Sequence, residues 1–523
     1  MAGAGTARPR SPGYGTSAVK RLLSLFLCGW TSLVCAAPTP GAGVRPPAVA
    51  GKFYPEEPAQ LEAAVKGFLD DALPARGERP IALVAPHAGY VYSGQIAADA
   101  YRQAMDYPYE VVVVLGANHA APAFDGVSVF QGTGYRTPLG VAPVDQELAR
   151  ALLDADPSIT FRPEAHAQEH SEEVQIPFVQ VVFPQARIVT AVVGRPDPGL
   201  AERFGRVLAR ALAGRQALIV ASSDLSHYPE YEDAVTVDRN TLTAIAGFDP
   251  AQVAAVLETQ LREEHRNLAT CACGAGPILA AMAAARELGA RRGIVISYAN
   301  SGGTVLGEQS RVVGYGAMAF TAGSGGPDVQ ALELVPAGPV SELSAADQQY
   351  LLALARQTIE RFLRSQTVPL PRPTGAALTA RQGAFVTLNE HGSLRGCIGH
   401  MAEDTPLALT VARMALQAAL RDPRFAPVRA EELPDLEAEI SVLTPLAPVP
   451  GPDAIVLGRD GVALEKAGRR AVFLPQVAPE QGWSRDEMLS HLCLKAELPA
   501  DCWQRGAAFH TFQARVFRES DHR

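Results

Sequence analysis

Four short apolar runs, rich in Val, Ile and Leu and broken by small residues, occur between residues 81 and 300. Runs of this length and composition predict strands that are buried on both faces of a sheet. The stretches before and between them carry apolar side chains at helical spacing. Strands that alternate with helices predict an α/β domain in which much of the sheet is parallel. The predicted strands are 81–85, 111–115, 218–221 and 294–297, and the predicted helices include 59–73, 145–154, 199–213 and 274–289.

The pattern changes after about residue 342. A stripe of apolar residues that runs from Leu351 to Leu363 at helical spacing predicts an amphipathic helix. Apolar runs bounded by glycine then predict two strands joined by a tight turn. This mixture of elements predicts a second, smaller α+β domain. Its predicted strands are 383–389, 392–399, 437–443 and 471–474, with a further helix at 484–497.

The chain begins with a basic stretch of 21 residues that lacks acidic side chains, followed by an apolar run over residues 22–36. A basic stretch followed by an apolar run is the order found in a secretory signal. The apolar run has 15 residues, which is too short to span a bilayer, since a span needs about 20. We expect export to the periplasm or the extracellular space, a cytoplasmic location if the run is not a true signal, and no membrane contact after removal of the leader. The predicted divisions are a leader at 1–44, a first domain at 45–322, a linker at 323–341 and a second domain at 342–523.

The composition narrows the class of protein. The chain has 523 residues, of which 47% are hydrophobic, and this fits two or three folded units. Its formal charge is −9, from 46 basic and 55 acidic residues, so we expect no nucleic-acid partner. Seven cysteines are too few for a disulfide scaffold. Five of them remain after the leader, so at least one stays unpaired, reactive or metal-bound.

Polar side chains that suit metal binding or catalysis follow three of the predicted strands. His87 follows the first strand, His119 the second, and Asp224 and His227 the third. Because ligands bind beyond the carboxyl ends of the strands in open α/β sheets, we expect these side chains to converge. Two imidazoles and a thiol suit iron, copper or zinc, and three protein ligands leave coordination positions open.

Cys271 and Cys273 are the candidate thiols for this set. Cys273 opens a predicted helix, whose N-terminus favours a thiolate, whereas Cys271 fits a small buried hydrophobic residue. Asp224 and His227 share a loop, and they are candidates for acid–base work or for orienting a ligand.

A further candidate, His170, lies in a segment rich in acidic residues. If this segment is helical, the spacing of three residues places His170 and Glu173 on one face, and a solvated charged turn is the alternative. His166 and His265 have no comparable neighbours in the sequence, and we expect them at the surface.

Five ordered motifs between residues 45 and 322 resemble the Memo family. The resemblance implies a mixed sheet flanked by helices, similar to that of the class III extradiol, non-haem iron dioxygenases. It also implies iron or copper at His87, His119 and Cys273, with Asp224 and His227 nearby. A secretory leader departs from the usually cytosolic members of the family. The motifs are Pro86-His-Ala-Gly-Tyr-Val-Tyr-Ser-Gly94, Leu115-Gly-Ala-Asn-His119, Glu169-His-Ser-x-Glu-x-Gln-x-Pro-Phe178, Ser222-Ser-Asp-Leu-Ser-His227 and Cys273-Gly-Ala-Gly-Pro277.

Residues from about 342 to 520 resemble the AMMECR domain, most specifically in the run Leu394-Arg-Gly-Cys-Ile-Gly399. Cys397 lies between glycines there and is a candidate reactive thiol, and Arg395 is a candidate to stabilise a thiolate or to bind an anion. The alternative is that the glycines serve only strand packing and backbone conformation. Other matching runs are Asp422-Pro-Arg-Phe425, Glu439-Ile-Ser-Val-Leu-Thr-Pro445 and Val472-Phe-Leu-Pro-Gln476.

These features together predict a metal-dependent redox enzyme that uses Fe(II) or Cu, with zinc less favoured. Three candidate catalytic residues, Asp224, His227 and His170, would orient ligands or move protons. The alternative is a non-catalytic scaffold that binds a small molecule or peptide and recruits a radical-SAM enzyme, because the domain pair resembles the AmmeMemoRadiSam system. A zinc hydrolase is a third alternative, but the sequence has no His-Glu-x-x-His helix.

Overall fold

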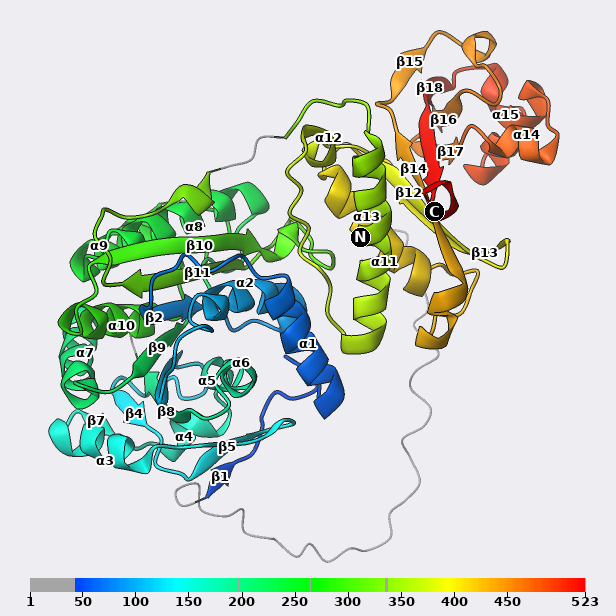
Figure 1. The fold of residues 1–523 in the computed structure, drawn as a ribbon. Coiled ribbons are helices and arrows are strands. Elements are labelled where there is room, and N and C mark those ends of the chain that lie inside the picture. Colours follow the sequence, from blue (N-terminus) through cyan, green and yellow to red (C-terminus); the bar gives the residue numbers. More distant parts are fainter. Residues whose placement is uncertain (1–42, 195–196, 264, 334–336, 523) are drawn as a thin grey trace, which may run out of the picture. The chain divides into compact units, whose positions relative to one another are not determined.

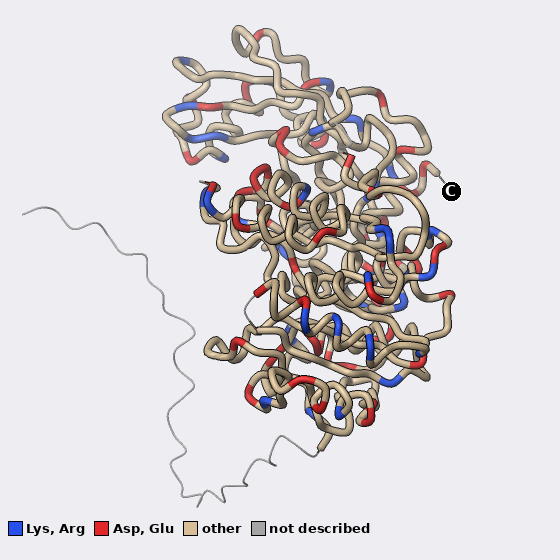
Figure 2. Tube along the Cα trace, turned by 90° about the vertical axis from the view of Figure 1, so that its left-hand side faces the viewer, with Lys and Arg blue, Asp and Glu red and all other residues tan. Residues whose placement is uncertain are grey.

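The computed structural model describes residues 43–194, 197–263, 265–333 and 337–522. The predicted secretory segment lies outside these residues. Within the described ranges, no helix combines the length and the apolar character needed to cross a bilayer. Basic and acidic residues are interspersed on the side of the molecule that Figure 2 shows.

An eight-stranded mixed sheet forms the centre of the first domain (Figure 1). In spatial order its strands are β10 (Arg292–Asn300), β11 (Gly314–Thr321), β2 (Pro80–Ala85), β9 (Ala217–Ser222), β3 (Val111–Ala117), β8 (Arg187–Val193), β4 (Val127–Val129) and β7 (Ile159–Thr160). The four strands from β2 to β8 are parallel neighbours, while β11 and β4 pair with them in the antiparallel direction. The carboxyl ends of β2, β9 and β3 therefore meet at one edge.

Helices pack on both faces of this sheet. α10 (Ala275–Glu287) packs against α7 (Pro198–Leu212) and the sheet, and α2 (Tyr90–Arg102) packs against α1 (Pro58–Asp70) and the sheet. Gly205 permits the close approach of α7 and α10, because a Cβ there would lie 2.6 Å from the Ala280 carbonyl oxygen. This cover explains why β3 is buried along its whole length. The other helices are α3 (Gln146–Ala155), α4 (Pro163–Ala167), α5 (His170–Glu173), α6 (Ile176–Val182), α8 (Tyr231–Ala246) and α9 (Pro250–Arg262).

The predicted α/β architecture is confirmed, and each of its predicted strands and helices is present within a few residues of the expected position. Part of the predicted linker at 323–341 belongs to this domain, because Asp328 forms a β-bridge with Ile294 and Leu332 is buried in the core. A small second sheet includes the first described segment of the chain. It consists of β1 (Val44–Arg45), β5 (Gly134–Thr137) and β6 (Gly140–Pro143).

Two four-stranded sheets, each with its own hydrophobic core, form the second domain. In spatial order the first consists of β13 (Ser393–His400), β12 (Ala384–Glu390), β14 (Leu436–Leu443) and β19 (Ala514–Arg518), and the second of β15 (Ala447–Val449), β18 (Ala508–Phe512), β16 (Gly461–Lys466) and β17 (Arg469–Phe473). The predicted α+β mixture is confirmed. The helices are α11 (Ala345–Ser365), α12 (Ala376–Thr379), α13 (Leu407–Leu420), α14 (Val477–Gln481) and α15 (Arg485–Lys495).

One disulfide lies in the core of the second sheet. It joins Cys493 on α15 to Cys502. Cys271, Cys273 and Cys397 are the free thiols of the described residues. The expectation that at least one cysteine stays unpaired is therefore confirmed for this part of the chain.

Candidate metal centre

The candidate ligands lie at the carboxyl ends of the parallel strands. His87 follows β2, His119 follows β3, and Cys273 lies just before α10. The Nε2 atom of His87 is 3.2 Å from the Cys273 sulfur. One ligand atom from each of the three residues lies within 4.8 Å of the other two. The fold thus brings together two imidazoles and a thiol that are far apart in the sequence.

A hydroxyl group sets the orientation of the His87 ring. The Ser222 oxygen lies 3.0 Å from His87 Nδ1, and its single hydrogen is donated to the Ser171 carbonyl oxygen at 2.6 Å. The hydrogen in the contact with His87 must therefore reside on Nδ1, which leaves Nε2 with a lone pair. Burial, with repulsion by neighbouring imidazoles, holds the pKa of His87 well below its usual value. The ring is neutral, as a metal ligand must be.

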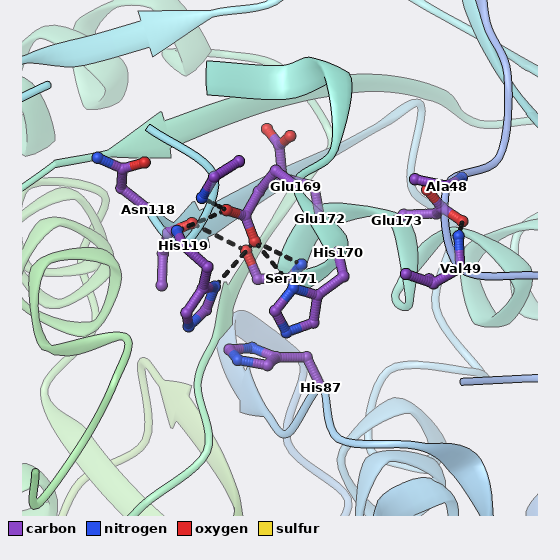
Figure 3. A network of polar contacts seen from close by, with 12 residues as sticks. Ala48, Val49, His87, Asn118, His119, Glu169, His170, Ser171, Glu172 and Glu173 are labelled. Carbon is purple, nitrogen blue, oxygen red and sulfur yellow. Dashed lines mark hydrogen bonds and ion pairs between the residues drawn. The ribbon is translucent and has the colours of Figure 1, made fainter. Parts of the chain in front are cut away.

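Glu169 orients the second imidazole (Figure 3). Its carboxylate accepts hydrogen bonds from His119 Nδ1 at 2.9 Å, from the His119 backbone N–H at 2.6 Å and from the Ser171 N–H at 2.9 Å. Burial would raise the pKa of Glu169, but these contacts lower it to about 2. Burial also lowers the pKa of His119, but the hydrogen bond and charge of Glu169 outweigh it and raise that pKa. Because Nδ1 is occupied, Nε2 of His119 is left for a ligand.

A third imidazole, that of His170, turns toward the rings of His87 and His119 (Figure 3). Its ring centroid lies 4.5 Å from that of His119 and 5.3 Å from that of His87. Burial and the neighbouring His119 lower the pKa of His170 to about 4. The His170 ring is therefore neutral near pH 7.

Asp224 and His227 lie on the loop after β9, close to Cys273. Candidate ligand atoms of these three residues also lie within 4.8 Å of one another. The Asp224 carboxylate accepts the backbone N–H groups of His87 at 2.8 Å and of Ala88 at 3.2 Å. It therefore fixes the loop that carries His87. Burial raises the pKa of Asp224 although the charge of His227 and these hydrogen bonds lower it.

The surroundings of Cys273 differ from those predicted for a thiol at a helix start. Burial, followed by the charge of Asp224, raises the pKa of Cys273 above its usual value. A cation at the sulfur would supply the charge that stabilises a thiolate there, so the donor set fits a metal ion. Cys271 is buried, with its sulfur 3.8 Å from the Leu257 carbonyl oxygen, and it fits a small core residue.

Glu173 lies outside this centre. Its carboxylate accepts hydrogen bonds from Arg45 at 2.6 Å, from the Tyr54 hydroxyl at 2.6 Å and from the Ala48 N–H at 2.8 Å. In Figure 3 it turns toward the segment that contains Ala48, while His170 turns toward the other imidazoles. The shared functional face predicted from the spacing of His170 and Glu173 is therefore not observed.

The prediction that His166 lies at the surface is wrong. The ring is buried, with Nε2 2.9 Å from the Ser128 hydroxyl and Nδ1 3.1 Å from the Glu172 carboxylate. Ser128 comes from β4, a strand too short to show a pattern in the sequence. His265 is partly exposed, and its ring nitrogens lie 3.6 Å from Asp233 and 3.4 Å from Glu263.

Three residues that shape the centre were not predicted as part of it, namely Ser222, Gln175 and Glu169. Gln175 donates to the Ser222 oxygen at 2.9 Å and to the Pro86 carbonyl oxygen at 2.9 Å. All three lie within motifs noted above, so a sequence signal exists. Their roles depend on which strand ends adjoin, and that information is not local to any motif.

In the second domain, the hydrogen bonds of the Arg395 guanidinium go to groups other than the Cys397 thiol. It donates to the Glu432 carboxylate at 2.8 and 3.0 Å and to the Ala426 carbonyl oxygen at 2.9 Å. The guanidinium that contacts Cys397 belongs to Arg424, which donates to the Cys397 carbonyl oxygen at 3.2 Å. Arg424 was not among the predicted site residues.

Known proteins resemble both parts of the chain. A family described as Memo-like protein matches residues 45–319, and one described as AMMECR1 matches residues 352–517. A MEMO1 family protein of Ignicoccus hospitalis is 36% identical over 292 residues, which cover 53% of this chain and 98% of the relative. A MEMO1 family protein of Aquifex aeolicus is 37% identical over 278 residues, with coverage of 53% and 99%. The crystal structure of the uncharacterized protein PH0010 from Pyrococcus horikoshii is 39% identical, covers 32% of this chain and 90% of that chain, and has a TM-score of 0.31.

The Memo-like match extends over more than half of the chain and contains every residue of the candidate centre. The second match lies within the predicted second domain. The chain therefore belongs to the Memo-like protein family, and an AMMECR1 domain follows its Memo-like domain.

Proposed function

We propose that the chain is a metal-dependent redox enzyme whose iron or copper ion is held by His87, His119 and Cys273. The observation that carries this proposal is the clustering of one nitrogen from each of two imidazoles and a thiol sulfur within 4.8 Å of one another. Both imidazoles are bonded through Nδ1 to other groups, as metal-ligating histidines commonly are. A bound iron or copper ion would supply Lewis acidity and electron transfer toward dioxygen or an organic substrate.

The surrounding residues have separate tasks in this proposal. Glu169 and Ser222 hold the two imidazoles in the ligating tautomer, and Asp224 fixes the backbone of the His87 loop. His170 is neutral near pH 7 and would orient a group bound beside the metal through a hydrogen bond. His227 has a ring nitrogen within 4.8 Å of the Cys273 sulfur, and it would orient a ligand or move a proton there.

Anaerobic purification followed by elemental analysis tests the proposal. We expect about one equivalent of iron or copper per chain, and loss of nearly all of it in His87→Ala and in Cys273→Ser. His265→Ala, which removes an imidazole outside the centre, should retain the metal. Thermal melts of the metal-free proteins would separate loss of ligation from loss of folding.

The redox part requires a second measurement. Cycles of oxidation by dioxygen and reduction by ascorbate should change the oxidation state of the iron or copper ion while the ion stays bound. Electron paramagnetic resonance follows this change. Binding of zinc alone, or full metal content in both ligand variants, would overturn the proposal.

We further propose that the chain works in an oxidising compartment outside the cytoplasm. The apolar leader and the Cys493–Cys502 disulfide support this location, because structural disulfides persist mainly in such compartments. Recruitment of a radical-SAM enzyme by the second domain stays a prediction.

A further inference from the structure

A cavity of about 580 Å³ lies beside helix α13. Its walls come from α13, from α11, from the end of β13 with the segment that follows it, and from the loop between β10 and β11. The volume falls within the range of about 300–1,000 Å³ that is typical of small-molecule sites. The described residues that line the cavity include none of the candidate metal ligands. The cavity is therefore separate from the candidate metal centre.

The Arg413 guanidinium of α13 borders this cavity. Its Nε donates to the Thr304 carbonyl oxygen at 3.2 Å, and its Nη2 donates to the carbonyl oxygens of Gly302 at 2.7 Å and Gly307 at 3.0 Å. Its Nη1 has no hydrogen-bond partner among the described residues. The guanidinium is therefore held in place by uncharged groups while one of its nitrogen atoms stays available to a ligand.

Burial makes an anionic partner favourable for Arg413. The side chain is half-buried, and burial lowers its pKa, although the charge of Asp404 acts in the opposite direction. Asp404 is bonded to the His400 ring at 2.7 Å and to the Thr405 hydroxyl at 2.9 Å, rather than to the guanidinium. An anion in the cavity would supply the charge that the half-buried guanidinium lacks.

A second cation, Arg421, follows the end of α13 and also borders the cavity. Its side chain is exposed, and it forms no ion pair or side-chain hydrogen bond with any residue that the structure describes. Glu308 is the other acidic residue of the wall, and it is exposed to water. Arg413 and Arg421 thus both offer N–H groups that no carboxylate of the wall occupies.

Much of the remaining wall is apolar. Leu306 is 39% exposed, which is unusual for a leucine, and it borders the cavity together with Phe362, Met414 and Leu420. These side chains offer hydrocarbon surface that a ligand would remove from water. A ligand that fits both features of the wall has one anionic group and an apolar body.

We propose that this cavity binds a small organic carboxylate with an aliphatic body. The carboxylate accepts hydrogen bonds from Arg413 Nη1 and from Arg421, and the aliphatic body lies against Leu306 and Phe362. This site goes beyond the proposed metal chemistry and requires no metal ion.

Isothermal titration calorimetry of the full chain with octanoate and with octan-1-ol tests the site. The two probes share an eight-carbon body and differ in charge. We expect one octanoate to bind per chain, with octan-1-ol about tenfold weaker, because hydrogen bonds to a charged group are lost. Arg413→Gln and Arg421→Gln should each weaken octanoate toward the affinity of octan-1-ol and leave octan-1-ol unchanged.

Arg364→Gln is the matched control for the arginine variants. Arg364 is exposed, as Arg421 is, and it lies on α11 outside the cavity wall. This variant should leave both affinities unchanged. Gln417→Trp fills the cavity from α13 while both arginines stay, so it should abolish the binding of both probes. If Arg413→Gln fails to fold, Arg421→Gln and Gln417→Trp decide.

Equal affinities for the two probes, an unchanged octanoate affinity in Gln417→Trp, or no octanoate binding would overturn the proposal. His87→Ala removes a candidate metal ligand and should retain octanoate binding. Loss of octanoate binding in His87→Ala would place the carboxylate at the metal centre and would likewise overturn this site. Metal content is a separate readout, so failure of the cavity proposal is distinct from failure of the proposed function.

Discussion

The Ser222 hydroxyl illustrates how a side chain outside the candidate ligand set can shape the candidate metal centre. Its hydrogen is committed to the Ser171 carbonyl oxygen, and its lone pairs receive hydrogen bonds from Gln175 and from His87 Nδ1. The His87 ring is thereby held in one orientation and one tautomer before any ion arrives. Such outer partners usually contribute strongly to metal affinity.

Replacement of Ser222 by Ala should lower the affinity of the centre for added metal about tenfold. The His87 ring then loses the group that fixes its Nδ1 hydrogen. Titration against a chelator of known affinity measures the change. Ser128→Ala is the control, since Ser128 is equally buried and bonds to a histidine outside the centre, His166. The Ser128→Ala variant should lower the stability of the chain and leave its metal affinity unchanged. An equal loss of metal affinity in both variants would contradict this account.

Asp238 connects three elements of the first domain. Asp238 lies on α8. Its carboxylate accepts a hydrogen bond from the Ser226 N–H, in the loop after β9, at 2.8 Å, and another from the Tyr298 hydroxyl of β10 at 2.9 Å. Gly314 of β11 leaves room for it, because a Cβ there would lie 2.0 Å from Asp238 Oδ2. Burial raises the pKa of Asp238 to about 7, although its hydrogen bonds act in the opposite direction.

This raised pKa predicts a specific dependence of stability on pH. An unfolded aspartate loses its proton near pH 4, whereas Asp238 in the folded chain keeps it until about pH 7. Between these values the folded state binds more protons, so the contribution of Asp238 to stability decreases as pH rises. Asp238→Asn should remove this contribution.

Denaturant unfolding at pH 5 and pH 8 measures the effect as the difference between the parent chain and the variant. Relative to Asp238→Asn, the parent should lose stability between the two values. The control Asp154→Asn alters an exposed carboxylate on α3 and should follow the parent. Identical pH profiles for Asp238→Asn and the parent would refute the assignment.

The sequence predicts elements well where the physical signal is local. Strands β2, β3 and β9 are continuous apolar runs followed by polar residues, so both the strands and the positions of His87 and His119 could be predicted. The burial of His166 and Glu173 could not be predicted from the sequence. The polar atoms of these side chains are satisfied by partners that are distant in the chain, such as Ser128 and Arg45. The tautomer of His87 likewise depends on Ser222 of β9 and Ser171 of α5, which meet only in the fold.

At the level of the whole chain, the core around α15 consists of residues of the second domain alone. The Cys493–Cys502 disulfide closes a short loop in this core. Replacement of both cysteines by Ser should destabilise this part by about 2–3 kcal/mol. Unfolding monitored at Trp483 and Trp503, which pack on the same core, would report the loss.

The metal content of this double variant should equal that of the parent chain, because every ligand lies in the first domain. Loss of the metal together with the disulfide would show that the two domains do not fold separately. Retention of the metal with a lowered unfolding midpoint is the expected outcome.

His87 and Cys273 are 186 positions apart, yet their ligand atoms are in contact. A chain emerging from the ribosome cannot assemble the donor set until Cys273 has left the exit tunnel and the sheet has closed. In the proposed metal centre, binding of the ion would therefore follow folding of the sheet. If the chain crosses a membrane unfolded and binds an ion as proposed, that ion must come from the compartment in which the chain folds.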